Sequence, residues 1–430
     1  MKAIQAARGT RDLLPPETEL WNHIEATARR VFARYCFGEI RTPIFEDTQL
    51  FARSVGEETD IVSKEMYTWE DRARAQSEKA QSLTLRPENT AGVVRAYIEH
   101  KLGESGLLQK LYYIGPQFRR ERPQKGRYRQ FYQIGAEVIG PTSAGSESPL
   151  RDAEVLEMLA TLLGELGIVD WKLYLNSVGS ASDRPRYVLA LQEALKEIAP
   201  KLCADCQRRA QTNPLRVLDC KIPEDQPFIE TLPKIAEFLD ANSRVHFAQV
   251  CAALDACGVP FILNPRLVRG LDYYTRTTFE FVHAGLGAQN ALLGGGRYDG
   301  LSEAIGGPKA PGIGFAMGAD RLVLTLQAQQ EAPSAMPRLA DAYIAPLGEA
   351  QQEQALVLAR ELRQAGLRVE LGDGNFRIKK SFEVGNRLAR RIVLFGEEEA
   401  QSGIMTVKDF ASGAQTKVPR AELAQALQRK

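Results

Sequence analysis

Apolar and polar positions alternate along this chain with a period that changes from segment to segment, and that period predicts the elements. Residues 20–35 have helical spacing, and residues 39–45 have the composition of a strand that ends near Pro43. Between residues 180 and 258 the spacing is mostly helical without a motif typical of a binding site, so this stretch is interpreted as an insertion. Further strands are predicted at 83–86, 171–175, 261–281 and 291–318, and further helices at 87–100 and 151–166.

The C-terminal part of the chain alternates between strand-like and helical spacing. It follows a stretch rich in Ala, Pro and Ser, residues 331–337, which has little periodicity and is the best linker candidate. Alternating strands and helices predict a small α/β domain. We therefore expect a first domain over residues 1–328, a linker over 329–338 and a second domain over 339–430. Within the last domain the predicted elements are strands at 342–345, 368–371 and 392–395, helices at 351–363 and 380–389, a hairpin at 404–418 and a final helix.

Residues 112–140 carry the most informative pattern. Two β-prone runs flank a loop crowded with Arg and Lys, which predicts an antiparallel hairpin with a long cationic tip. By the two-residue period of a strand, one face collects guanidinium, amide, carboxylate and aromatic groups, with glycines that leave room between them. Half-buried strands usually turn an apolar face inward, so this polar face is interpreted as the floor of a ligand site. Its members are Tyr113, Gly115, Gln117 and Arg119 on the outgoing strand and Phe131, Gln133, Gly135 and Glu137 on the return strand.

Composition narrows the class of protein. A chain of 430 residues is long enough for two or three domains with sizeable cores. The net charge of +1 gives no global basic field, so any contact with nucleic acid must come from local patches. The first ten residues lack a secretory pattern, and no stretch approaches the ~20 apolar residues of a membrane span. With six Cys and no export signal, we expect reduced thiols, a cytoplasmic location and no membrane contact.

Several segments, taken together, resemble the class II aminoacyl-tRNA synthetases in their histidine–tRNA ligase form. Phe118 to Phe131 resembles the second signature motif of that class, and Pro311 to Leu322 resembles the third. The helix and strand near the N-terminus resemble the first motif, which builds the dimer interface in the family. Segments similar to ones particular to histidine–tRNA ligases, or lining their site, are 8–12, 84–90, 267–275 and 294–299.

The resemblance implies an α+β fold, in which an antiparallel catalytic sheet is flanked by helices. It also implies a helical insertion over about 180–258 and a C-terminal α/β anticodon-binding domain. The implied reaction joins ATP and L-histidine into histidyl-adenylate and then moves histidine to tRNA(His). ATP would enter with Mg²⁺, no tightly bound protein-ligated metal is expected, and the chain would form a homodimer.

The resemblance also assigns the groups that hold the two anions. Arg119 and Arg269 would be the catalytic cations at the α-phosphate, where Arg269 does work that some relatives give to a metal. A planar guanidinium suits this task better than an ammonium because it donates two aligned hydrogen bonds. Glu121 would contact adenine, Phe131 would stack on it, and Arg321 would hold the γ-phosphate in the first turn of a helix, where the dipole favours an anion.

The remaining implied roles concern histidine and tRNA. Glu88, Thr90 and Gln133 would accept hydrogen bonds from the α-ammonium, and Asn89 stands where the family usually has a smaller residue. Glu137 with Tyr274, beside Tyr273, would bind the imidazole, which needs a donor or an acceptor at each nitrogen. The basic tip would contact the acceptor end of tRNA because phosphates bind Arg and Lys. Its residues are Arg122, Gln124, Lys125, Arg127 and Arg129.

Simpler interpretations of these residues remain open. Glu88 and Thr90 could merely cap a helix, and Tyr273 and Tyr274 could be core aromatics. The basic cluster around residues 377–391 fits a solvated helix face about as well as it fits anticodon binding.

The cysteines of the insertion and the function of the whole chain each have a rival interpretation. Cys203, Cys206 and Cys220 suggest zinc, but a closed structural site requires four ligands and no His lies near. Cys251 and Cys257 could contribute only by folding back, so plain thiols are favoured. The rival function is a non-catalytic regulatory paralogue of histidine biosynthesis, which senses histidine beside ATP phosphoribosyltransferase. That paralogue typically lacks the C-terminal domain and degrades the segment around Arg269, and this chain keeps both.

Overall fold

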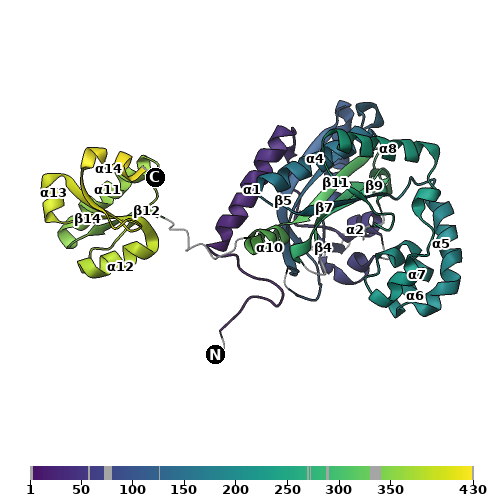
Figure 1. Ribbon diagram of the computed structural model, residues 1–430, viewed down its shortest axis with the longest axis horizontal. Coiled ribbons are helices and arrows are strands. Elements are labelled where there is room, and N and C mark those ends of the chain that lie inside the picture. Colours follow the sequence, from purple (N-terminus) through teal and green to yellow (C-terminus); the bar gives the residue numbers. More distant parts are fainter. Residues whose placement is uncertain are drawn as a thin grey trace. The chain divides into compact units, whose positions relative to one another are not determined.

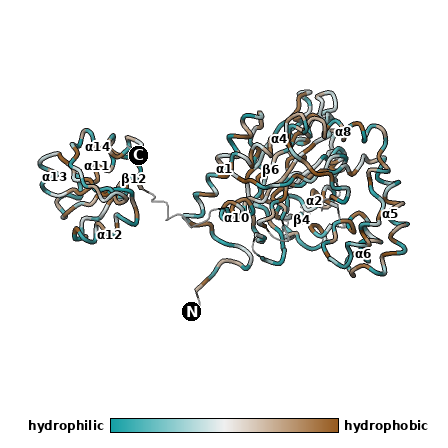
Figure 2. The backbone as a smooth tube through the Cα atoms, viewed as in Figure 1, coloured by the Kyte–Doolittle hydropathy of each residue, from teal (hydrophilic) through white to brown (hydrophobic). Residues whose placement is uncertain are grey.

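The chain divides into two compact units, Met1–Glu331 and Ala332–Lys430, in the computed structural model shown in Figure 1. Each unit has its own buried apolar core (Figure 2). Among the described residues, no helix combines the length and the apolar content needed to cross a membrane. The structure describes residues 3–56, 59–71, 80–124, 126–268, 271, 273–286, 290–329 and 340–428.

An eight-stranded sheet organises the first unit, in the order β1-β5-β6-β11-β10-β9-β7-β8. The six central strands pair antiparallel, and only the short edge strands β1 and β8 pair in parallel. The antiparallel sheet that the sequence predicts is therefore confirmed. The strands are β1 (Gly38–Glu39), β5 (Gln109–Phe118), β6 (Gln130–Ile139), β7 (Trp171–Ser177), β8 (Ile262–Leu263), β9 (Thr275–His283), β10 (Ala291–Arg297) and β11 (Gly312–Gly318).

Four helices cover one face of this sheet and enclose the main core: α1 (Glu17–Arg34), α4 (Pro149–Glu165), α8 (Ala241–Ala256) and α10 (Ala319–Gln329). The helical spacing of residues 20–35 is confirmed, since its apolar residues Trp21, Ile24, Ala28, Val31 and Phe32 are all buried in α1. Side-chain caps fix where two of the helices begin. The Ser148 hydroxyl accepts from the backbone N–H of Leu150 at α4, and the Asp240 carboxylate accepts from Ser243 at α8.

A second, three-stranded sheet stands beside the large one, in the order β2-β4-β3: β2 (Phe45–Asp47), β4 (Gln81–Leu85) and β3 (Tyr67–Asp71). The single strand predicted over residues 39–45 is wrong, because its two ends join different sheets. Pro43 lacks an N–H for a ladder. The guanidinium of Arg86 donates hydrogen bonds to the carbonyl oxygens of Thr42 and Pro43, at 3.0 and 3.2 Å. These oxygens therefore bond to a side chain and not to a neighbouring strand.

The helix predicted from residue 87 begins later than expected, as α3 (Thr90–Glu99). The reason is a side-chain cap. The Glu88 carboxylate accepts from the backbone N–H groups of Thr90 and Ala91, at 2.7 and 3.0 Å, which leaves Pro87 to Asn89 outside the helix. Two shorter helices, α2 (Thr48–Val55) and α9 (Leu301–Ala304), pack near it.

The insertion forms a small helical layer with its own core (Figure 1). It contains α5 (Arg184–Ile198), α6 (Ala204–Thr212) and α7 (Gln226–Ile229), joined by short 3₁₀ turns. Its buried apolar residues run from Tyr187 to Leu239, whereas Val250 and Leu254 of α8 belong to the main core. The separate core therefore covers a shorter stretch than 180–258.

The second unit is the α/β domain that the sequence predicts. Its sheet has the order β13-β12-β14-β15-β16, with three parallel strands followed by an antiparallel hairpin. The acidic helix α13 was not predicted because six residues are too few to display a helical period. The elements are β12 (Ala340–Pro346), α11 (Gln352–Gln364), β13 (Val369–Leu371), α12 (Ile378–Leu388), β14 (Ala389–Phe395), α13 (Glu397–Ser402), β15 (Ile404–Asp409), β16 (Gln415–Pro419) and α14 (Arg420–Gln428).

Candidate active site

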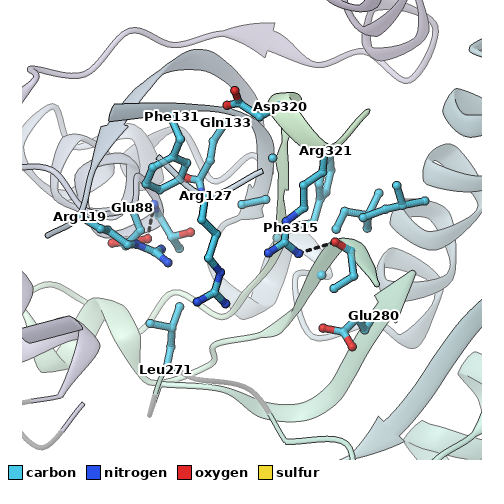
Figure 3. A pocket seen from close by; sticks show the side chains of 18 of the residues that line it. Glu88, Arg119, Arg127, Phe131, Gln133, Leu271, Glu280, Phe315, Asp320 and Arg321 are labelled. Carbon is cyan, nitrogen blue, oxygen red and sulfur yellow. Dashed lines mark hydrogen bonds between the residues drawn. The ribbon is translucent and has the colours of Figure 1, made fainter. Parts of the chain in front are cut away.

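A cavity of about 310 Å³ lies over strands β6, β9, β10 and β11 of the large sheet, and the tip of the β5–β6 hairpin closes one side of it. Figure 3 shows Glu88 and Arg119 at one end and Arg321 and Glu280 at the other, with Arg127 reaching between them. The cavity is therefore long, with a carboxylate and a guanidinium at each end.

Part of the polar face that the strand period predicts forms the floor of the cavity. The members of that face that line the cavity are Arg119, Phe131, Gln133 and Glu137, whereas Tyr113, Gly115, Gln117 and Gly135 do not. The register of the hairpin pairs Tyr113 with Gly135 and Gly115 with Gln133, which places the predicted residues on one face. The glycines leave room, but for protein groups rather than for a ligand. A Cβ at Gly135 would lie 2.4 Å from the Tyr113 ring, and one at Gly115 would lie 2.6 Å from the guanidinium of Arg86.

Arg119 follows directly after β5 and is held in place from behind. Its Nε donates to the carbonyl of Pro87 at 2.9 Å, and its guanidinium lies 5.2 Å from the centroid of the Phe131 ring. One terminal nitrogen lies 3.8 Å from a carboxylate oxygen of Glu121. The guanidinium is thus oriented by a backbone carbonyl and an aromatic face, and both Arg119 and Phe131 line the cavity.

Acceptors for a cationic group gather beside Arg119. The carboxylate of Glu88 is buried at the start of α3, and burial raises its pKa. It caps that helix and also lines the cavity, so it does not merely cap, and the Thr90 hydroxyl donates to Glu137 instead of capping. The Oε1 atom of Gln133 is buried in the floor and has no hydrogen-bond partner among the described residues. Asn89 points elsewhere, since its Oδ1 accepts from the Thr42 hydroxyl at 2.6 Å and it does not line the cavity.

Glu137 is the most perturbed carboxylate of the site. It is fully buried in β6, and its two oxygens accept from the hydroxyls of Thr90 and Tyr298, at 2.7 and 2.8 Å. Burial raises its pKa to about 8, in spite of these two donors. Gly314 on β11 makes room for it, because a Cβ there would lie 1.7 Å from Oε2 of Glu137.

Three tyrosines form the wall next to Glu137. The rings of Tyr273 and Tyr274 lie 4.8 Å apart, and those of Tyr273 and Tyr298 lie 6.0 Å apart. Burial raises the pKa of Tyr273 well above its ordinary value, so its hydroxyl stays protonated. In the predicted pair Tyr274 is therefore buried and Tyr273 is partly buried, and both line the cavity.

Arg321 stands at the other end of the cavity, in the first turn of α10. Its Nη1 donates to the carbonyl of Ala291 at 2.5 Å. The preceding residue, Asp320, accepts a hydrogen bond from Arg11 at 2.9 Å. This contact holds the segment around residues 8–12 beside the site, where the resemblance implies that it lies. Glu280 on β9 adds a carboxylate to this end of the wall.

The basic tip divides into inward and outward residues. Arg127 lines the cavity and pairs with Glu121 at 2.9 Å, so it is a wall residue rather than a free surface cation. Arg129 donates to the backbone carbonyl of Arg8 at 3.3 Å and holds the N-terminal segment. Of the predicted tRNA contacts, the exposed ones are Arg122 and Gln124. Lys125 and Arg269 lie outside the described residues.

Reasoning from the sequence assigned no site role to several residues that line the cavity, among them Tyr298 and Glu280. Tyr298 follows a run of three glycines, and that motif was the available signal. The neighbouring Arg297 does not line the cavity: it is fully buried and pairs with Asp152 at 2.5 Å and with Asp299 at 3.0 Å. Glu280 had no signal, because it is a lone carboxylate in an ordinary strand.

The cysteines of the insertion come together away from this cavity. The ligand atoms of Cys203, Cys206, Cys220 and Asp225 all lie within 4.8 Å of one another. The expectation that a fourth ligand is missing was therefore wrong. A carboxylate supplies the fourth donor, and the sequence argument had considered only His and Cys.

Comparisons with known proteins cover almost the whole chain. A family model described as histidyl-tRNA synthetase matches residues 9–322, and one described as an anticodon binding domain matches residues 341–430. The histidine–tRNA ligase of Koribacter versatilis (strain Ellin345) is 70% identical over 98% of this chain and 95% of its own length. That of Solibacter usitatus (strain Ellin6076) is 54% identical over 98% of each chain. The crystal structure of the apo histidyl-tRNA synthetase of S. aureus is similar with a TM-score of 0.80 and 36% identity, covering 99% of this chain and 100% of that one.

Proposed function

The chain belongs to the histidyl-tRNA synthetase family, and we propose that it activates L-histidine with ATP in the cavity over β6 and β11 and transfers it to tRNA(His). It is an aminoacyl-tRNA ligase, and its C-terminal unit is the anticodon-binding domain of that family. The observation that carries the assignment of the site is the placement of charge. Carboxylate and amide acceptors stand beside Arg119 at one end, and Arg321 stands at the other.

The end near Arg119 suits the amino acid. The α-ammonium would donate to Glu88 and to the unpartnered Oε1 of Gln133. The α-carboxylate and the α-phosphate would both lie near the guanidinium of Arg119, which lowers the repulsion between two anions as one oxygen attacks phosphorus and pyrophosphate leaves. Arg269 is proposed as the second cation at that phosphate, by its resemblance to the family segment.

The imidazole fits against Glu137 and the tyrosine wall. A carboxyl with a pKa of about 8 is protonated at neutral pH and can donate to one ring nitrogen, or can accept if the proton moves to the imidazole. Tyr274 would serve the other nitrogen. A polar pocket of this kind can reject analogues that lack the side-chain nitrogens by roughly 10⁴–10⁵-fold, so no editing site is required.

The end near Arg321 suits the triphosphate. Arg321 would hold the γ-phosphate with help from Arg127, whereas Phe131 and Glu121, which lie beside Arg119, would take the adenine. ATP is a co-substrate that enters as its Mg²⁺ complex. Glu280 is a carboxylate at this end of the wall, and carboxylate oxygens are ligands that Mg²⁺ prefers.

The acceptor end of tRNA would meet the outward part of the hairpin tip, where Arg122 and Gln124 are exposed. In the other domain, Lys380 and Arg387 pair with Glu383, and Arg391 pairs with Asp409. The cluster on α12 is therefore partly neutralised, and the exposed Arg377, Lys379 and Arg390 are the stronger candidates for anticodon contact. Arg122→Ala should raise the KM for tRNA several-fold and leave pyrophosphate exchange unchanged; a change in exchange alone would contradict this assignment.

We further propose a homodimer that forms through the three-stranded sheet. Phe45 and Trp69 lie on that sheet with 53% and 39% of their surfaces exposed, and their rings contact each other 6.0 Å apart. This aromatic pair and the exposed Ile44 beside it form an apolar patch, and such patches are typical of protein–protein interfaces. Sedimentation equilibrium should give twice the chain mass, and Phe45→Glu should shift the protein to monomers; an unchanged dimer would place the interface elsewhere.

We place its work in the cytoplasm, where ATP and tRNA are found. Its six cysteines are free, which suits a reducing compartment. Recovery of the expressed protein with a periplasmic or membrane fraction would contradict this placement.

Aminoacylation tests the whole proposal. Purified full-length protein, labelled histidine, Mg²⁺–ATP and total tRNA should give acid-precipitable histidyl-tRNA at a rate proportional to enzyme. Binding of histidine without charging would instead favour the regulatory rival. The comparisons favour the ligase over that rival, since the full-length relatives carry the ligase name and the anticodon domain is present.

A further inference from the structure

Four side chains of the insertion converge at a point remote from the catalytic cavity. They are Cys203, Cys206, Cys220 and Asp225, and none of them lines that cavity. Cys206, Cys220 and Asp225 are buried, and Cys203 is half-buried. The four ligand atoms, three sulfurs and one carboxylate oxygen, lie within 4.8 Å of one another.

Three separate pieces of chain supply these groups. Cys203 is the residue just before α6, and Cys206 stands in the first turn of that helix. Cys220 follows a 3₁₀ turn that spans Pro214–Asp219, and Asp225 precedes α7. A Cys-x-x-Cys pair at the start of a helix points both sulfurs to one side, and the loop that follows the 3₁₀ turn brings the other two donors against them.

Backbone N–H groups already orient two of the four side chains. The N–H of Cys203 donates to both oxygens of Asp225, at 3.0 and 3.2 Å, and the N–H of Ile222 donates to the sulfur of Cys220 at 3.4 Å. The Gln226 amide donates to the carbonyls of Cys220 and Ile222, each at 2.9 Å, and closes the loop. Such outer contacts fix ligands in place and favour the negative forms of sulfur and oxygen.

The carboxylate of Asp225 is buried without a cationic side chain among the described residues to neutralise its charge. Its side chain is 2% exposed, and within the described part of the chain no Lys, Arg or His forms an ion pair with it. Its neighbours are thiols, and the Cys220 sulfur lies 3.2 Å from Oδ2. Buried carboxylates are normally paired with a cation or bound to a metal, because burial of an unpaired charge is costly.

We propose that Cys203, Cys206, Cys220 and Asp225 bind one Zn²⁺ ion, which holds the insertion together. Zn²⁺ prefers four ligands in a tetrahedron, with sulfur at about 2.3 Å and carboxylate oxygen at about 2.0 Å, so neighbouring sulfurs would stand about 3.8 Å apart and a sulfur and an oxygen about 3.5 Å apart. The present spacings, none above 4.8 Å, need a contraction of no more than about 1.3 Å. A multi-iron cluster would instead separate its ligands, because the cluster occupies the space between them.

Binding requires no oxidant or reductant. Zn²⁺ displaces the thiol protons to solvent, so its affinity for the four ligands increases with pH. The ion would join the start of α6 to the loop before α7, next to core residues such as Val217 and Leu218. The bound ion would stabilise the folded insertion, which is too small to bury a large apolar core.

Metal content of the purified full-length protein tests the proposal. After expression in zinc-supplemented medium and dialysis, elemental analysis should give close to one zinc per chain. Cys220→Ser and Asp225→Asn should each lower the content or weaken zinc binding at least tenfold against a competing chelator. The matched control Cys251→Ser removes a cysteine outside the cluster and should keep one zinc per chain.

A second measurement, on the wild-type protein, tests the proposal even if the variants fail to fold. Co²⁺ added to the metal-free wild-type protein should give intense visible bands of a tetrahedral ion and near-ultraviolet bands of thiolate ligation. Less than a tenth of a zinc per chain, with no such bands, would overturn the proposal. So would full zinc content in Cys220→Ser, or a disulfide between two of the three cysteines in the protein isolated without reductant.

Discussion

The hairpin β5–β6 and the helical insertion show two different ways in which functional groups are placed. In the hairpin, the groups recur at every second residue, and the sheet turns them to one face. In the insertion, Cys206, Cys220 and Asp225 belong to three separate turns and meet only because those turns pack around a small core. The first arrangement depends on local geometry, and the second depends on tertiary structure.

This difference has an energetic counterpart. The hairpin face is supported by ladder hydrogen bonds and by neighbours such as Arg86, so its side chains are oriented before any ligand arrives. The cluster in the insertion places a carboxylate among thiols without a cation among the described residues, so its arrangement is completed by the metal ion that we propose. Substitutions on the hairpin face should therefore change chemistry, and substitutions in the cluster should change stability.

The largest effect is expected at Arg119. Replacement by Ala removes the charged donor at the place where two anions meet and should lower the rate of histidine-dependent pyrophosphate exchange by about 10³-fold. Steady-state exchange kinetics measure it. Arg29, which pairs with Glu25 on the surface of α1, offers a matched control, since Arg29→Ala should stay within twofold of the wild type. A loss below tenfold for Arg119→Ala would show that the hairpin face is not the activation site.

Glu137 should reveal itself through the pH dependence of stability. Its pKa of about 8 in the folded protein lies above its ordinary value of 4.5, so the folded state prefers the protonated form and loses stability as pH rises between these values. Between pH 6 and pH 9 this loss amounts to about 3 kcal/mol, at about 1.4 kcal/mol for each unit of pKa. The Glu137→Gln variant lacks this titrating carboxyl. Its melting temperature should therefore fall less between pH 6 and pH 9 than that of the wild-type protein. Parallel curves would mean that Glu137 ionises normally.

Gly314 tests the fit of the imidazole pocket. A Cβ at this position would lie 1.7 Å from the Glu137 carboxylate, so Gly314→Ala must displace that side chain. The KM for histidine should rise by about 30-fold, since roughly 2 kcal/mol of contact is lost, while the KM for ATP changes little. Gly164→Ala is the control, because a Cβ there meets nothing within 4 Å. An equal rise in both KM values would indicate general distortion of the sheet.

The smallest effect on catalysis is expected in the insertion. Cys220→Ser should leave pyrophosphate exchange within about threefold of the wild type, because the cluster contributes no group to the cavity. The same variant should melt at a lower temperature, since a ligand that binds only the folded state stabilises it. Exchange reduced as strongly as in Arg119→Ala would erase the distinction between the two regions.

The sequence predicted the parts of the site that local geometry decides. The two-residue period placed Gln133 and Glu137 on one face whichever strand they would pair with. It could not show that Arg127 folds inward to Glu121, because a long loop has no period. Nor could it show that Tyr298 donates to Glu137, since a residue of β6 and one that follows β10 meet only in the finished sheet.

The errors in the predicted fold have similar causes. The strand predicted over residues 39–45 is interrupted because Arg86, from a distant part of the chain, donates hydrogen bonds to the carbonyl oxygens of Thr42 and Pro43. The fourth donor of the cysteine cluster was missed because an isolated Asp in a loop is common and carries no signal alone. Side chains that act across the fold are thus the ones that a linear pattern hides.

Pyrophosphate exchange into ATP, measured with each of the twenty amino acids in turn, tests the central claim most directly. The account predicts exchange with histidine at least ~10⁴-fold above exchange with any other amino acid, because the pocket around Glu137 is built for two ring nitrogens. It also predicts that this exchange needs no tRNA. Exchange with a different amino acid, or none with any amino acid despite measurable binding of histidine, would contradict the assignment of this cavity.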